Sequence, residues 1–184
     1  MWIGTTTDGA YRLQLDKNEL THPILKGNIT SIYQDSEGEL WIGSWEEGLH
    51  HVKTDGTIEI FEYDAKNPYS ISSNFVRACC EDNLGNIWIG TFNGLNRYDK
   101  STGLFQNHTA SDAQSDGLTH SSIWCIVKDN QGTLWLGTYF GGVNYFNPEY
   151  EIYSRYMYSP IEKKGLSNPV VGRTIEAVSY THLT

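Results

Sequence analysis

Aromatic residues recur at one position of a repeated sequence pattern, four residues after a tryptophan. These residues are Trp45, Phe92 and Tyr139. Aromatic rings gathered around a rim are suited to stacking on the apolar faces of sugar rings, and polar neighbours such as Asn93 can hydrogen bond to the hydroxyl groups. The position is therefore a candidate site for binding a carbohydrate.

The same position also suits a structural role. An aromatic side chain at a hairpin turn often only covers the neighbouring part of a sheet, and this packing role is the commoner of the two. Loops on a rigid scaffold are nevertheless where binding residues are usually placed. Both interpretations stay open, and the choice depends on the elements that carry the three residues.

The tryptophans that precede these positions define an internal repeat. Trp2, Trp41, Trp88 and Trp135 are separated by 39, 47 and 47 residues. An aspartate stands six residues before each of the last three (Asp35, Asp82 and Asp129), and a glycine two residues after each (Gly43, Gly90 and Gly137). A period of about 40–50 residues is typical of propellers and other repeat architectures.

One repeat reads as four short strands. In the copy around Trp88, we expect strands over 74–81, 86–91, 95–98 and 104–109, with turns at 82–85 and 92–94. Repeated four-stranded units predict β-propeller blades, because a lone sheet cannot bury both of its apolar faces and radial stacking of blades does. The predicted fold is all-β, a propeller segment of about four four-stranded blades, with a β-sandwich as the alternative.

The repeats cover residues 1–176. Residues 170–176 look like the first strand of a fifth blade, whereas 177–184 depart from the repeat, and we interpret them as a tail that is foreign to it. The chain therefore reads as a fragment of a larger propeller. A small four-bladed ring, in which the last strand completes the first blade, is the alternative.

The repeated tryptophan, glycine and aspartate all have structural interpretations. Each tryptophan lies on the second strand of its blade and is expected to be wedged against the neighbouring sheet. The glycine that follows lets the next blade approach closely. The aspartate shapes the preceding turn by bonding to the downstream backbone. A carboxylate that recurs in every blade is not expected to be catalytic.

Propeller topology predicts which residues share one face. Loops that join second to third strands emerge on the same face as loops that join fourth to first strands. The three rim aromatic residues would therefore lie near Arg77 and His120, at or just before the starts of innermost strands. A charge on an otherwise apolar inner strand is expected to face the central channel or a partner. Arg77, Asn93 and His120 thus join the candidate ligand-binding residues.

Composition narrows the function classes. Of 184 residues, 22 are acidic and only 13 are Lys or Arg, for a net charge of −9, so binding to nucleic acid is not expected. No apolar run approaches the roughly 20 residues of a membrane span, and no signal peptide is visible, so we expect no membrane contact by this segment. The three cysteines and six histidines lack metal-ligand spacing, and neither a metal nor a cofactor is expected.

The string Asp82-x-x-Gly85-x-Ile87-Trp88-Ile89-Gly90-Thr91, followed by Gly94-Leu95 and Tyr98, resembles the two-component regulator propeller repeat. The resemblance implies the sensor region of a hybrid two-component histidine kinase of Bacteroidetes type, located in the periplasm. It further implies sensing of oligosaccharides released from polysaccharides. The implied partners are the remaining blades and sensor modules of a parent chain that also holds a membrane span and kinase domains.

Catalysis by this segment is not expected. The sequence shows no nucleophile elbow, no phosphate-binding loop and no isolated carboxylate pair. The enzyme alternative is a propeller lyase or glycosidase, and His120 and Glu81 are the candidate residues for the lyase. A propeller that only binds other proteins is the third hypothesis.

Overall fold

The regular secondary structure consists of β-strands wherever the chain is described. The structure is a computed structural model, and it describes residues 1–21, 23–110, 117–150, 152–159 and 165–174. Within these residues no helix forms, and no helix long and apolar enough to cross a membrane is found. The predicted all-β class is confirmed.

The strands form four antiparallel sheets, each built in chain order. The first sheet has three strands: β1 (Trp2–Gly4), β2 (Ala10–Gln14) and β3 (Glu19–Leu20). The second has four: β4 (Ile29–Gln34), β5 (Leu40–Ser44), β6 (Leu49–Val52) and β7 (Ile58–Phe61). The third comprises β8 (Val76–Glu81), β9 (Ile87–Thr91), β10 (Gly94–Asp99) and β11 (Leu104–His108). The fourth comprises β12 (Ile123–Lys128), β13 (Leu134–Thr138), β14 (Val143–Asn147) and β15 (Ile152–Tyr156).

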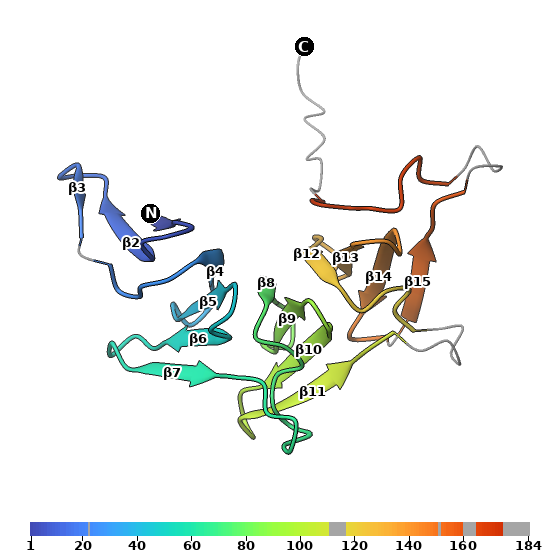
Figure 1. Cartoon of the computed structure of the whole chain (residues 1–184), viewed down its shortest axis with the longest axis horizontal. Helices are drawn as coiled ribbons and strands as arrows, with labels where there is room; N and C mark the ends of the chain where they lie inside the picture. Colours follow the sequence, from blue (N-terminus) through green and yellow to red (C-terminus); the bar gives the residue numbers. More distant parts are fainter. Residues whose placement is uncertain (22, 111–116, 151, 160–164, 175–184) are drawn as a thin grey trace, which may run out of the picture.

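The sheets stand side by side around a common centre, as the blades of a propeller do (Figure 1). The first strand of each four-stranded blade is innermost, and β8 lies beside both β4 and β12. The described residues form an open arc, in which β1 pairs with β2 only. This arrangement differs from the alternative of a closed four-bladed ring.

Residues 170–174 continue the arc beyond the fourth blade. The amide of Val171 donates to the carbonyl of Thr138 (3.0 Å), as the amide of Ile29 in β4 donates to that of Thr5 (2.9 Å). The segment therefore takes the place of a fifth innermost strand. It is not itself a strand, because no second strand pairs with it among the described residues. The predicted end of this strand, 175–176, and the tail 177–184 lie outside the described residues.

The spacing between aspartate and tryptophan has a direct structural cause. In the third blade, Oδ1 of Asp82 accepts the amides of Leu84 (2.8 Å) and Asn86 (2.9 Å), and Oδ2 accepts the indole N–H of Trp88 (2.7 Å). The same pattern links Asp35 to Trp41 (3.0 Å) and Asp129 to Trp135 (2.8 Å). One carboxylate thus holds both the turn and the indole ring of its own blade.

The tryptophans fill the spaces between sheets. Trp41 is fully buried, stacks on His51 of its own blade at 3.9 Å and contacts Tyr98 of the next blade at 5.2 Å. Trp88 is 2% exposed and meets Phe146 of the fourth blade edge-on at 5.4 Å. These rings form the centres of the apolar clusters between neighbouring blades.

The glycine after each tryptophan leaves room for the next innermost strand. A Cβ added at Gly90 would lie 2.7 Å from Cγ2 of Ile123, the first residue of β12. Gly43 meets Val76 in the same way, at 2.6 Å. At Gly43 the added Cβ would also lie 2.5 Å from Oγ of Ser31, and at Gly137 it would lie 2.5 Å from Sγ of Cys125 and 2.8 Å from the carbonyl oxygen of Val171. Blade spacing depends on this glycine.

Candidate ligand site at the channel mouth

Each innermost strand contains a bulge at its second residue. The register of pairing shifts between Ile29 and Ser31, between Val76 and Ala78, and between Ile123 and Cys125. The residues at the bulges are Thr30, Arg77 and Trp124, and Gly172 has the equivalent place in the last segment. A bulge turns a side chain away from its regular direction and is common beside functional sites.

The bulge residues line one cavity of about 670 Å³. Its wall is supplied by all three innermost strands and by the segment that carries Gly172 and Arg173, so the cavity is the mouth of the central channel. Thr6, Asn28 and Trp45, from the loops on this face, complete the rim. Of the residues expected on this face, Trp45 and Arg77 lie together on the cavity wall.

Arg77 lies between two tryptophans. Its guanidinium carbon is 4.3 Å from the ring centre of Trp45 and 4.6 Å from that of Trp124. No ion pair or hydrogen bond involves this side chain among the described residues, and its Nε is buried without an acceptor. Burial lowers the pKa of the Arg77 guanidinium from its ordinary value. The indole N–H of Trp124 is likewise buried without an acceptor.

The other predicted rim residues lie beside this cavity rather than on its wall. Tyr139 stacks on Trp124, with ring centres 5.2 Å apart and planes at 13°. Phe92 is 53% exposed and reaches Trp45 only through Phe75, which contacts both rings at 6.1 and 5.6 Å. For Tyr139, packing is the role that these contacts support.

The two remaining candidates are also outside the cavity wall. His120 accepts the amide of Ser122 at Nδ1 (3.0 Å) and packs on Phe140. Asn93 lies in the two-residue turn between β9 and β10, where its amide donates to the hydroxyl of Thr91 (3.1 Å). No contact among the described residues links either of them to Arg77.

The sequence analysis missed two residues, Trp124, which lines the cavity, and Phe75, which packs against Trp45 of its wall. A tryptophan inside an apolar strand reads as core, and Phe75 belongs to a segment that was expected to be a buried strand. The repeat is the sequence signal that could have identified Trp124. This residue follows Arg77 by 47 residues, the interval that separates Trp41 from Trp88 and Trp88 from Trp135. Two residues at equivalent positions of inner strands are expected to face the same channel.

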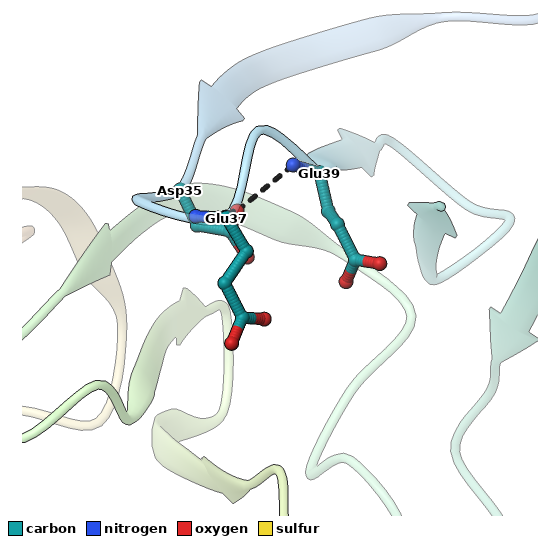
Figure 2. Close-up of side chains that lie close together, drawn as sticks. All are labelled: Asp35, Glu37 and Glu39. Carbon is teal, nitrogen blue, oxygen red and sulfur yellow. Dashed lines mark hydrogen bonds between the residues drawn. The ribbon is translucent and has the colours of Figure 1, made fainter. Parts of the chain in front are cut away.

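A second polar cluster lies at the turn between β4 and β5 and has a structural explanation. The side chains of Asp35, Glu37 and Glu39 gather there, and Oδ1 of Asp35 accepts the amide of Glu39 at 2.9 Å (Figure 2). Nζ of Lys100, from the next blade, donates to Asp35 and to Glu37, each at 3.0 Å. Glu39 bonds to His51 at 2.6 Å. The carboxylates are therefore partnered by cationic or ring N–H groups of the chain.

The electrostatics of this cluster tie two blades together. Burial acts to lower the pKa of Lys100, but its bonds to Glu37 and Asp35 outweigh burial and raise it. Burial acts to raise the pKa of Asp35, and its bonds to Trp41, Lys100 and the backbone lower it instead. Glu81 joins them by accepting the amide (2.8 Å) and hydroxyl (2.9 Å) of Ser36. The ion pairs connect the second blade to the third.

The residues of the lyase hypothesis do not converge. Glu81 ends β8, beside the turn that contains Ser36, whereas His120 precedes β12 near the channel mouth. The start of β8 lies by the start of β12, because Arg77 contacts Trp124, so the two candidates belong to opposite ends of the innermost strands. Cys79 and Cys80 offer no thiolate either, since burial raises their pKa to about 12 and about 11.

Radial four-stranded sheets around a lined channel define a β-propeller segment, and comparisons with known proteins agree. The family model of the two-component regulator propeller matches residues 23–46, 70–93 and 117–140. These three segments therefore match the two-component regulator propeller repeat, as the sequence indicates. Comparison with curated proteins finds no match.

Solved structures with the same fold include two from B. thetaiotaomicron and a lyase. The extracellular domain described as that of the hybrid two-component system BT3049 is 23% identical, with a TM-score of 0.73 over 94% of this chain. The corresponding domain of BT4673 is 23% identical, with a TM-score of 0.72 over 93% of this chain. This chain spans only 22% of each of them. Virginiamycin B lyase from Staphylococcus aureus is 14% identical, with a TM-score of 0.65 over 89% of this chain and 53% of the lyase.

Proposed function

We propose that this chain is the ligand-binding part of a sensor propeller in a hybrid two-component histidine kinase. The ligand is an oligosaccharide derived from a polysaccharide, and it binds at the mouth of the central channel, in the periplasm. The observation that carries the proposal is the group formed by Trp45, Arg77 and Trp124 on the wall of a cavity of about 670 Å³. The repeat family and the fold of the B. thetaiotaomicron domains support the sensory role.

The chemistry of the cavity suits a carbohydrate. Sugar-binding sites combine aromatic faces with a few directed polar groups, and this cavity has indole rings together with Asn28, Thr30 and Ser31. The Nε of Arg77 and the indole N–H of Trp124 have no acceptor among the described residues and belong to residues that line the cavity, so we expect ligand oxygens beside them. Trp45 keeps 36% of its surface exposed and can cover a sugar ring.

Binding to a panel of defined oligosaccharides, measured by calorimetry with this chain, tests the proposal. We expect Trp45→Ala to weaken binding about tenfold, because an aromatic contact is lost. The matched control is Tyr63→Ala, which removes an aromatic side chain that is 51% exposed and does not line the cavity. Equal binding by both variants, or no binding to any glycan, would contradict the proposed site.

A further inference from the structure

We infer that the ligand carries an acidic group, a carboxylate or a sulfate, which Arg77 binds with help from Arg173. The inference rests on the proposed function and names the chemical class of its ligand. Both guanidinium groups belong to the lining of the channel mouth. Arg77 is half-buried, and Arg173 is exposed.

The charge of the cavity is opposite to that of the chain. The chain carries 22 acidic residues against 13 Lys and Arg, yet the described lining contains two arginines and no carboxylate. Elsewhere Lys100 is paired with Asp35 and Lys53 with Glu59. Cationic side chains without nearby carboxylates attract anionic ligands, even on a protein whose net charge is negative.

The repeat itself does not require an arginine at this position. The equivalent residues are Thr30 and Trp124 in the other described inner strands and Gly172 in the last segment, and none of them is charged. Four-stranded antiparallel blades form around Thr30 and Trp124 as they do around Arg77. A residue that the scaffold does not demand, and that is costly to bury without a counter-ion, is best explained by a ligand.

The geometry at Arg77 suits an oxyanion. Its two tryptophan neighbours hold the planar guanidinium by cation–π contacts at 4.3 and 4.6 Å, which orients the group without using its N–H donors. A guanidinium held in this way is prepared for a two-point contact with a carboxylate, which a lysine cannot make. The pocket therefore combines a fixed anion contact with aromatic walls for the sugar ring.

The experiment compares acidic trisaccharides with uncharged partners of the same shape. We would titrate this chain with trisaccharides of galacturonate, glucuronate, mannuronate and guluronate, and with the methyl ester of each, together with neutral and singly sulfated galactotriose. We expect at least one acidic sugar to bind about tenfold or more tightly than its neutral form. We also expect that preference to shrink as salt is raised. The sulfated arm separates sulfate from carboxylate.

Variants assign the preference to Arg77. Arg77→Gln is expected to abolish the difference between acid and ester, and Arg77→Lys to retain only part of it. The control is Arg12→Gln, which removes an exposed guanidinium placed 5.8 Å over Trp2, outside the cavity. Thermal unfolding of each variant checks that the fold persists, and Arg77→Lys keeps the test valid if Arg77→Gln unfolds.

Three outcomes are distinct. A preference for the acid that depends on Arg77 supports the inference. Equal binding of acids and esters, or a preference that Arg77→Gln and Arg77→Lys leave intact, overturns the acidic ligand but leaves the proposed carbohydrate sensor standing. Binding of no acidic or neutral sugar overturns the proposed function, and the inference falls with it.

Discussion

Asp82 shows how one residue can fix the start of a blade. Its two carboxylate oxygens accept two backbone amides and the indole N–H of Trp88, and the residue is only 3% exposed. The interval of six residues between Asp82 and Trp88 follows from this geometry, because the turn must bring the second strand back until its tryptophan reaches the carboxylate of the aspartate. The recurrence of the pair in three blades therefore reflects a hydrogen-bond requirement.

We expect Asp82→Ala to lower the free energy of unfolding by about 2–4 kcal/mol, since several buried donors lose their acceptor. Chemical denaturation followed by tryptophan fluorescence measures the change. Asp55→Ala is the matched control, because Asp55 also accepts an amide two residues on, from Thr57 (2.8 Å), but lies in an exposed turn without a tryptophan. A loss at Asp82 no larger than at Asp55 would show that the indole link adds nothing.

Site residues were predictable from sequence where the repeat or an unexpected charge marked them. Trp45 was found from its place after a repeated tryptophan, and Arg77 from its charge on an apolar strand, and the structure puts both on the cavity wall. Trp124 was not found, because its exposure to the channel depends on the bulge at the start of β12. A bulge changes side-chain direction locally, and apolar patterning carries no sign of it.

Among the elements, the innermost strand of one blade is positioned by the second strand of the blade before it. Ile123 of β12 fits against Gly90 of β9, and Val76 of β8 against Gly43 of β5. The strands themselves were well predicted from sequence, with small differences at their ends. Strand β8 begins at Val76 rather than at residue 74, because Asn74 and Phe75 bond to the hairpin turns of neighbouring strands through their carbonyl groups.

We expect Gly90→Ala to destabilise the protein by about 1–3 kcal/mol, because the added methyl group would overlap Ile123 in a packed interface. Gly172→Ala is the control, since a Cβ there meets nothing within 4 Å. Thermal unfolding compares the two. Combining Gly90→Ala with Ile123→Ala should cost less than the sum of the single changes. Strict additivity would argue against this contact as the determinant of blade spacing.

For the whole molecule, burial of a blade depends on how many neighbours it has. All five residues of β5 and of β9, in the second and third blades, are buried, whereas no residue of β1 is fully buried. In the arc of Figure 1, the second and third blades each have a neighbouring blade on both sides. Such an array behaves as nearly one-dimensional, and the stability of each unit is the sum of its own folding and its contacts with neighbours.

Hydrogen exchange monitored by mass spectrometry should therefore follow a gradient along the arc. Amides of β5 and β9 are expected to exchange most slowly, those of β13 at an intermediate rate, and those of β1 and β2 fastest, because local opening of the first blade breaks contacts with one neighbour only. Gly90→Ala provides the internal check, since weakening the contact between the third and fourth blades should speed exchange in β13 while leaving β5 nearly unchanged. Uniform protection of all blades would instead show that the arc unfolds as one cooperative unit. In that case the free energy of the contacts between blades would exceed the free energy of folding of each blade alone.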